Sequence, residues 1–333
     1  MNYYFTAAVE NLGITQHLSP NDDDEDSNDI YVILNKYRQH PSITKIKEYI
    51  NVNESFNFNS IDDDDMSKEI ETLKNKKTNI ASDIPANILI ESCEITSGYL
   101  AKIYNVSKVN RTFPASLKLA NIKAIHKKKE RTLKENYRPI SLLPTVSKVF
   151  ERIMYNQIYL YIEKHLSSFL FGFRKGYSTE ECLIIMLEKW KQALDKKSKA
   201  GAILTDLSKA FDCLNHKLLI AKLHAYGFSI PSLEYIYSYL SERNQRTKIG
   251  SVSSSWKMIR TGVPQGSIFG PLLFNLYMND IFLFIPSPNV VSYADDNTTY
   301  AMEKDFETLI TTLENDTSIM MERFKINKNR GLK

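Results

Sequence analysis

The chain has 333 residues, of which 43% are hydrophobic and 25% are charged, and its formal net charge is +4. This composition is typical of a globular protein, and the 11 glycines and 11 prolines exclude a linker or a fibrous protein. The three cysteines lie far apart, which excludes a disulfide framework and favours a reducing compartment. The first residues, MNYYFTAAVENLG, lack the pattern of a signal peptide, and no stretch approaches the ~20 apolar residues of a membrane span. We therefore expect an intracellular protein that does not enter a membrane.

Charge is distributed unevenly along the chain. Acidic residues gather early, in NDDDEDSND at 21–29 and DDDD at 62–65, and residues 1–40 are polar enough to be flexible. Basic residues gather in the middle, in a stripe that comprises Lys102, Lys108, Arg111, Lys118, Lys123, Lys127, Lys128, Lys129, Arg131, Lys134 and Arg138. Such a stripe suits a polyanion such as nucleic acid, but a solvated surface also explains it, and the stripe alone favours the solvated surface.

Hydrophobic spacing predicts both helices and strands in the rest of the chain. Helical patterns cover 62–77, 84–104, 144–166 and 271–285. Strand patterns cover 119–125, 136–143, 201–205, two segments within 245–260, and a hairpin at 292–301. Asn215 suits a helix cap, Gly227 a helix stop, and Pro231 the first turn of the next helix. The apolar run at 201–205 is typical of a fully buried strand. The mixture predicts an α+β fold with an antiparallel sheet that carries helices on one face.

Three carboxylates stand at the ends of predicted strands. Asp206 follows the strand at 201–205, and Asp295 and Asp296 lie in the hairpin SYADDNTTYA. An isolated pair of aspartates is more often a surface turn than a site. If the hairpin lies beside the strand at 201–205, however, Asp206 meets one of the pair, and the like charges need a cation to neutralise them. Carboxylates without His or Cys favour Mg²⁺, and two such ions about 4 Å apart suit phosphoryl transfer.

Five strings of residues occur in series along the chain. They are NYRPISLLPTVSKVFERIM (136–154), FGFRKGYST (171–179), LTDLSKAFDCLNH (204–216), GVPQGSIFGPLLFNLYMNDI (262–281) and YADD (293–296). In this order they resemble the reverse transcriptase of non-LTR, LINE-type retrotransposons of the jockey-like kind, over about Ser82 to Ala301. The resemblance implies an RNA-directed DNA polymerase that transfers a nucleotide from a dNTP to a primer 3′-hydroxyl with two Mg²⁺ ions, or with Mn²⁺ in their place. It also implies an RNA template, a DNA primer or nicked target DNA, and a location in the cytoplasm and nucleus.

The same resemblance implies the fingers and palm of a right-handed polymerase. The expected parts are a flexible acidic segment (1–40), a connector or N-terminal extension (41–105) and a reverse transcriptase domain (106–333), with fingers at about 106–199 and palm at about 200–305. Members of this family usually carry an endonuclease before the polymerase and a thumb after it. Too few residues precede the matching region for the endonuclease, and the C-terminal part is incomplete. We therefore expect a chain truncated at both ends and without a thumb, either the tail of a longer polyprotein or the product of a decayed copy. Whether the endonuclease is a separate product of the same element or part of a longer precursor stays open.

Residue by residue, the resemblance implies a catalytic metal site. Asp206 matches the acid of the first palm motif, and Asp295 and Asp296 match the acids of the third, with Asp295 the stronger ligand candidate. The backbone carbonyl of Leu207 would also face the metal or the triphosphate.

It also implies a nucleotide site. Phe211 would stack under the sugar and exclude a 2′-hydroxyl, although by itself it is better explained as a core aromatic. Gln265 and Gly266 would touch the nucleotide and the template base, although Pro-Gln-Gly is also an ordinary turn. Arg138 would reach the triphosphate.

Other basic residues are assigned by resemblance alone. Lys127 or Lys128 would assist Arg138 at the triphosphate, although solvated surface charge explains these lysines equally well. Arg174 and Lys175 would lie near the template strand.

Two alternatives remain open. The first is a catalytically inactive retrotransposon remnant that at most binds nucleic acid. The second is an RNA-dependent RNA polymerase, which shares the metal chemistry but needs room for a 2′-hydroxyl where Phe211 stands.

Overall fold

The computed structural model describes residues 1, 4–6, 27–51, 54–75, 84–127, 130–207, 210–285 and 289–327. Most of the acidic run at 21–29 lies outside these residues. Part of the segment expected to be flexible is helical, because Ile30–Lys36 form a helix whose Ile30 and Ile33 are buried. Among the described residues, no helix combines the length and the apolar character that crossing a bilayer requires.

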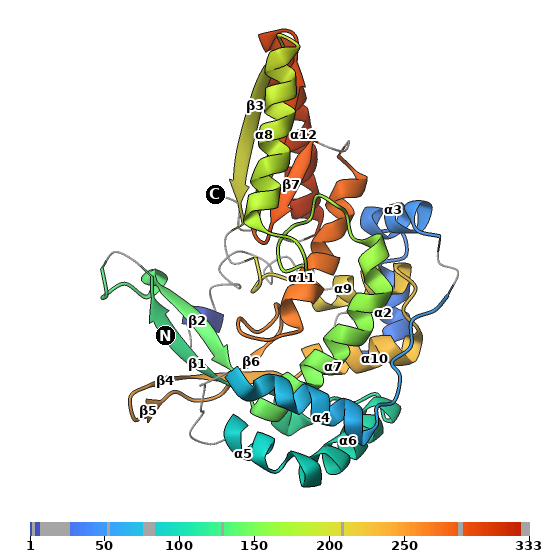
Figure 1. Cartoon of the computed structure of the whole chain (residues 1–333), viewed down its shortest axis with the longest axis vertical. Coiled ribbons are helices and arrows are strands. Elements are labelled where there is room, and N and C mark those ends of the chain that lie inside the picture. The colour runs from blue at the N-terminus through green and yellow to red at the C-terminus, as the bar shows by residue number, and fades with distance from the viewer. Residues whose placement is uncertain are drawn as a thin grey trace.

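Helices form most of the body of the molecule, and two sheets extend from it (Figure 1). The α-helices are α2 (Ile30–Lys36), α3 (Pro41–Tyr49), α4 (Asp63–Glu71), α5 (Ala86–Glu91), α6 (Cys93–Val109), α7 (Thr145–Ile162), α8 (Thr179–Asp195), α9 (His216–Ala225), α10 (Ile230–Leu240), α11 (Gly270–Met278) and α12 (Phe306–Ile326). Short 3₁₀ helices are η2 (Thr72–Asn75), η3 (Ala115–Lys118), η4 (Lys134–Asn136), η5 (Glu163–His165) and η6 (Asn279–Leu283). The strands are β1 (Leu119–His126), β2 (Tyr137–Leu142), β3 (Lys199–Asp206), β4 (Arg243–Ile249), β5 (Val252–Ser253), β6 (Lys257–Ile259), β7 (Val290–Tyr293) and β8 (Asp296–Glu303).

Local signals place several helix ends where the sequence predicts them. The side chain of Asn215 accepts a hydrogen bond from the backbone N–H of Leu218 at 2.9 Å and caps α9. Gly227 follows α9 with a φ of 92°, a left-handed conformation that glycine adopts without strain. Pro231 lies in the first turn of α10, after the cap Ser229. These predictions are confirmed because capping depends on neighbouring residues alone.

The two sheets have different topologies. In the first, the strand order is β2-β1-β4-β5, and β6 pairs with β4. Its strands β1 and β2 are antiparallel, whereas β1 and β4 are parallel. The second sheet has the order β3-β8-β7 and is fully antiparallel. The predicted neighbourhood of the hairpin and the strand at 201–205 is confirmed, because β3 pairs along its whole length with β8.

The second sheet lies between two helices, α8 and α12 (Figure 1). Tyr300 packs with Cys182 and Met186 of α8, and the next residue, Ala301, packs with Leu309 and Leu313 of α12. Neighbouring residues of a strand point to opposite faces, so each helix covers one face. The prediction of helices on one face only is wrong for this sheet.

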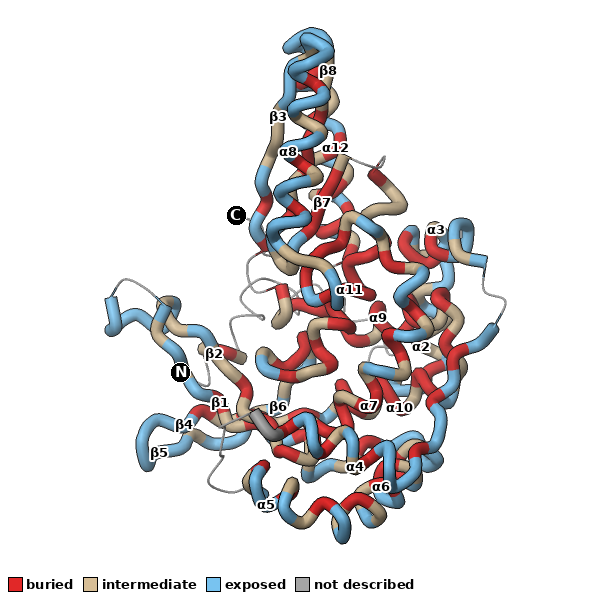
Figure 2. Tube along the Cα trace, viewed as in Figure 1, coloured by how far each residue is buried: buried red, intermediate tan, exposed pale blue. Residues whose placement is uncertain are grey.

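Strand β3 is an edge strand. It pairs with β8 alone, and the side chain of Leu204 is 81% exposed. Figure 2 shows that buried residues concentrate in the helical body rather than along β3. The prediction that 201–205 is fully buried is therefore wrong, because an apolar run does not reveal whether a strand is central or at an edge.

Buried polar contacts connect the helices of the body. Lys222 of α9 forms an ion pair with Asp280 of η6 at 2.7 Å, and both side chains are almost inaccessible. His216 begins α9, and its Nε2 lies 2.6 Å from the carbonyl oxygen of Gly262. A carbonyl can only accept, so Nε2 carries the proton. This contact joins α9 to the segment that precedes Val263.

Burial lowers the pKa of His216 to about 4, and the hydrogen bond to Gly262 opposes that shift only in part. The unfolded chain therefore binds more protons than the folded chain between about pH 6.5 and pH 4, and stability falls as the pH falls through this window. We expect His216 to account for a loss of roughly 3 kcal/mol in the free energy of unfolding between pH 7 and pH 4. Urea unfolding across this range, with wild type and His216→Gln, measures the loss. Equal pH dependence in the two proteins would contradict this assignment.

Candidate active site

The carboxylates lie where β3 and the β7–β8 hairpin end together. Asp206 is the last residue of β3 and stands directly opposite Asp296, the first residue of β8. Asp295 lies in the tight turn that joins β7 to β8. Cross-strand neighbours have their side chains on the same face of a sheet, so the structure brings Asp206 and Asp296 together.

These charges repel one another. Partial burial raises the pKa of Asp296, and the nearby carboxylates of Asp295 and Asp206 raise it further. Among the described residues, no three His, Cys, Asp or Glu side chains are grouped closely enough to hold a metal ion as they stand. The donors are nevertheless all carboxylate oxygens, which suit a hard cation such as Mg²⁺, and a cation would relieve the repulsion that the pKa of Asp296 reports.

A short segment between α7 and α8 supports the carboxylate hairpin. The backbone N–H of Phe171 donates to the carbonyl of Ser292 at 2.8 Å, and the N–H of Ser292 donates to the carbonyl of Phe169 at 2.9 Å. The next residue after Phe171, Gly172, lies so close to the hairpin that a Cβ there would be 2.1 Å from the backbone nitrogen of Ala294. Ala294 itself has a φ of 59°, so the turn that carries Asp295 is strained as well as tightly packed.

A pocket of about 480 Å³ opens beside this hairpin. Six of the residues that the family resemblance assigns to nucleotide or metal binding line it, namely Lys127, Arg138, Phe211, Gln265, Gly266 and Asp295. They come from β2, from the segments that follow β1 and β3, from the turn before α11 and from the β7–β8 hairpin. Their individual roles stay predictions, but the fold does place them around a single cavity. Lys128 lies outside the described residues.

Phe211 forms part of the pocket wall. Its ring stacks on Phe274 of α11 with 4.6 Å between ring centroids, and it forms an edge-to-face pair with the ring of Phe173 at 5.5 Å between centroids. Phe211 therefore packs against the hydrophobic core and also lines the pocket. The packing fits a core aromatic, and the role of Phe211 under the sugar stays a prediction.

The turn Val263–Gly266 connects several elements. The carbonyl of Gln265 accepts a hydrogen bond from the backbone N–H of Ser141 in β2 at 2.7 Å, and a Cβ on Gly266 would lie 2.6 Å from the carbonyl oxygen of Ser141. The N–H of Val263 donates to the carbonyl of Phe211 at 2.9 Å. The turn thus fixes β2, which carries Arg138, against the loop that carries Phe211.

A buried polar network anchors the segment that directly follows this turn. The fully buried carboxylate of Glu151 accepts hydrogen bonds from the backbone N–H of Ile268 at 2.7 Å and from the hydroxyl of Tyr239 at 3.0 Å. Burial raises the pKa of Glu151, while Arg243 and the two donors oppose the shift. No sequence pattern indicates this role for Glu151, because its donors lie 88 and 117 residues away.

The side chain of Arg174 is largely buried, and its role near the template strand stays a prediction. Its side chain is only 8% exposed, and Nη1 donates to the carbonyls of Ser167 and Leu170. The guanidinium also lies over the ring of Tyr177. These contacts disfavour direct binding of the template by Arg174, whereas Lys175 is exposed and its assignment stays a prediction.

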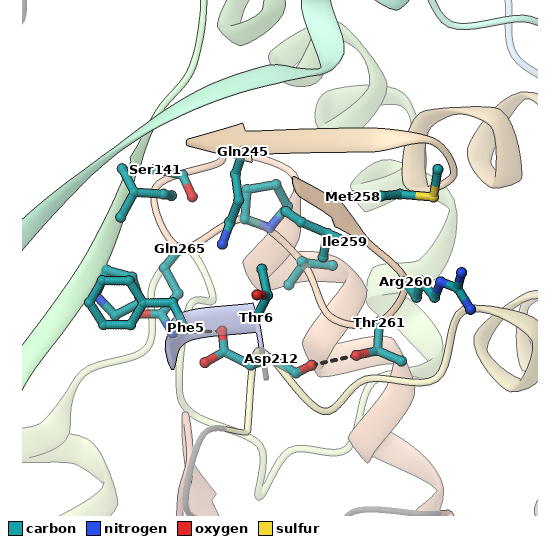
Figure 3. A pocket seen from close by; sticks show the side chains of 14 residues that line it. Phe5, Thr6, Ser141, Asp212, Gln245, Met258, Ile259, Arg260, Thr261 and Gln265 are labelled. Carbon is teal, nitrogen blue, oxygen red and sulfur yellow. Dashed lines mark hydrogen bonds between the residues drawn. The ribbon is translucent and has the colours of Figure 1, made fainter. Parts of the chain in front are cut away.

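Two features of the site were not predicted from the sequence: an N-terminal pair of aromatic residues in the pocket wall, and a second, smaller cavity beside it. Tyr4 and Phe5 line the larger pocket, and Lys134 lies over the ring of Tyr4. A nucleotide that fills the pocket has to lie beside these two side chains or displace them. A smaller cavity of about 100 Å³ shares Phe5, Asp212 and Gln265 with the larger one and continues towards β4 and β6 (Figure 3).

Residues 125–329 match the reverse transcriptase (RNA-dependent DNA polymerase) family. This match covers more than half of the chain, so the chain belongs to that family.

Curated relatives include a probable RNA-directed DNA polymerase from transposon BS of Drosophila melanogaster, which is 37% identical over 59% of this chain and 22% of that protein. The probable RNA-directed DNA polymerase from transposon X-element of the same fly is 36% identical over 59% of this chain and 21% of that protein. The RNA-directed DNA polymerase from its mobile element jockey is 32% identical over 67% of this chain and 23% of that protein. The resemblance to jockey-like retrotransposons is thereby confirmed, and the chain spans less than a quarter of the length of these relatives.

The close approach of Gly172 to Ala294 predicts a steric effect. We expect Gly172→Ala to lower the free energy of unfolding by about 1–3 kcal/mol or more, because the methyl group meets backbone that cannot move aside. Amide hydrogen exchange should show faster opening of the hairpin, read at Ser292 and Asn297. Gly176→Ala is the matched control, since its φ of 81° strains the backbone by about 1–2 kcal/mol but nothing lies within 4 Å of the added carbon. Unchanged hairpin protection in Gly172→Ala would contradict the steric argument.

Proposed function

We propose that this chain is an RNA-directed DNA polymerase of a mobile element. The observation that carries the proposal is the single pocket that contains Arg138, Phe211, Gln265 and Asp295. A phosphate-binding guanidinium, an aromatic ring, an amide and a carboxylate are the groups that a dNTP and its metal ion require. Family membership supplies the class of reaction.

Asp206, Asp295 and Asp296 are the residues that would hold Mg²⁺, or Mn²⁺, together with the backbone carbonyl of Leu207. Bound there, two such ions would activate the primer 3′-hydroxyl and stabilise the departing pyrophosphate. The pairing of Asp206 with Asp296 supports this assignment, and so does the raised pKa of Asp296. The family resemblance favours Asp295 over Asp296 as a ligand, and the presence of Asp295 in the pocket supports that order.

The remaining pocket residues bind and orient the nucleotide in this proposal. Arg138 binds the triphosphate, with Lys127 beside it as a second cation. Phe211 lies under the sugar, where its ring leaves no room for a 2′-hydroxyl. Gln265 contacts the nucleotide, and Gly266 allows the main chain to approach it and the template base.

We assign the first sheet and its neighbours, at about 106–199, to the fingers, and about 200–305 to the palm, although β4, β5 and β6 of the first sheet come from within the second range. RNA template, DNA primer or nicked target DNA, and dNTPs are the proposed partners, with an endonuclease from the same element. The proposed location is the cytoplasm and nucleus, where RNA and genomic DNA are found.

Primer extension tests the polymerase directly. Wild type should extend a DNA primer on an RNA template with dNTPs and Mg²⁺, and Asp295→Asn should reduce the rate by about 100-fold or more, because even residues that only support metal ligands contribute about 10–100-fold. Asp195→Asn is the control, since this exposed carboxylate ends α8 away from the pocket. Folded wild type without extension would favour the alternative, an inactive fragment that at most binds nucleic acid.

Sugar selectivity tests the role of Phe211. Phe211→Ala should raise kcat/KM for ribonucleotides relative to deoxynucleotides by about 10-fold or more, because one steric clash removed at a pocket wall is worth at least ~1–3 kcal/mol. Phe211→Tyr keeps the ring and should keep the selectivity. The free energy of unfolding of both variants should be measured as well, since Phe211 also packs on Phe274. Wild type that uses both sugars equally would favour an RNA-dependent RNA polymerase.

A further inference from the structure

Asp212 directly follows Phe211 and lies in the loop after β3. Its Oδ1 accepts a hydrogen bond from the side-chain Nε2 of Gln265 at 2.8 Å. Both residues line the larger pocket, and Figure 3 shows their side chains approaching each other in the adjoining smaller cavity. The contact joins two segments that lie 53 residues apart in the sequence.

This contact determines which way the amide of Gln265 points. An amide group has a donor end and an acceptor end of nearly the same shape, whereas a carboxylate can only accept. Nε2 therefore has to face Asp212, and the carbonyl Oε1 has to face away from it. Among the described residues, Oε1 has no hydrogen-bond partner, so it is available as an acceptor in the pocket.

Both partners are held firmly by their own main chains. The carbonyl of Gln265 accepts from Ser141, and the carbonyl of Asp212 accepts from the hydroxyl of Thr261 at 3.0 Å. Gly262 packs so closely on the same loop that a Cβ there would lie 2.7 Å from the Cα of Asp212. The orientation of the amide is thus set before a ligand binds, and binding does not have to order it.

We propose that Asp212 is a positioning residue that fixes the side-chain amide of Gln265 with its carbonyl turned towards the incoming nucleotide. This inference rests on the proposed polymerase function. A nucleotide offers hydroxyl and amino groups as donors, and a preset acceptor binds such a donor without an ordering cost. Asp212 acts through Gln265 and does not itself need to touch the nucleotide or the metal.

A purely structural tether would behave differently. It would lower stability when removed, and it would affect kcat and KM together or neither of them. A positioning role predicts a selective loss of nucleotide affinity, because the amide of Gln265 can then turn its donor end to the pocket.

Steady-state primer extension with a varied dNTP concentration tests this prediction. Asp212→Asn retains the size of the side chain but can accept or donate, so it no longer dictates the orientation. We expect KM for dNTP to rise about 3-fold to 10-fold, the value of one hydrogen bond, while kcat changes by less than about 2-fold. Asp212→Leu should have at least the same effect on KM.

A double-mutant cycle with Gln265→Met tests whether Asp212 acts through Gln265. Once the amide is absent, adding Asp212→Asn should raise KM no further. Asp316→Asn is the matched control, because Asp316 accepts at 2.8 Å from the side-chain amide of Asn289, a contact of the same chemistry outside the pocket. It should leave KM unchanged. Additive effects of the two pocket substitutions, or an unchanged KM in Asp212→Asn, would overturn the inference.

A second measurement does not depend on polymerase activity. In protein labelled with ¹⁵N-glutamine, the side-chain NH₂ signal of Gln265, assigned by its absence in Gln265→Met, should be a single, slowly exchanging pair. In Asp212→Asn it should shift and broaden or divide into two sets. An identical signal in both proteins would overturn the positioning role, whether or not the wild type extends a primer. A wild type that does not extend, but shows the expected signals, would instead contradict the proposed function and leave the positioning of the amide supported.

Discussion

The candidate active site depends on main chain that packs directly against main chain. At Gly172, Gly262 and Gly266, a Cβ would lie 2.1 to 2.7 Å from backbone atoms of another segment. Gly172 meets the carboxylate hairpin, Gly262 meets the loop after β3, and Gly266 meets β2. Any side chain at these points would separate the segments, and the pocket residues would no longer surround a single cavity. The chemistry of the pocket residues therefore depends on three residues without side chains.

These contacts also explain how charged groups of both signs share a small region. Asp206 and Asp296 are held opposite each other by the pairing of β3 with β8, and not by mutual attraction, since their charges repel. Arg138 is held across the pocket by β2, whose position depends on Ser141 and its hydrogen bond to Gln265. The free energy for this arrangement comes from the buried helical body, in which residues of α7, α9, α10 and α11 form one continuous core. The site stores electrostatic repulsion that a cation and a triphosphate together would relieve.

The sequence predicted the local and the sequential features well. Helix ends at Asn215 and Gly227 were predictable because caps depend on adjacent residues. The meeting of Asp206 with the hairpin was predictable because strand ends share an edge when the strands pair. The presence of a helix on each face of the second sheet was not predicted, since no helix was assigned from the sequence to 179–195 or to the residues of α12 beyond the hairpin. The burial of Arg174 was not predictable for a related reason: nothing in FGFRKG reveals that its guanidinium donates to the carbonyls of Ser167 and Leu170.

The sequence could not reveal the polar contacts between residues that lie far apart along the chain. Two such contacts hold the region around Gln265 in place. From one side Glu151, in α7, accepts the N–H of Ile268, and from the other Asp212 accepts the amide of Gln265. Both groups are carboxylates and can only accept, so Glu151 holds the backbone at Ile268 and Asp212 orients the side-chain amide of Gln265. A buried carboxylate such as Glu151 is costly unless its donors are in place, which makes an intact turn a condition for a stable core. The stability of the fold and the geometry of the nucleotide pocket are consequently coupled through the same few residues.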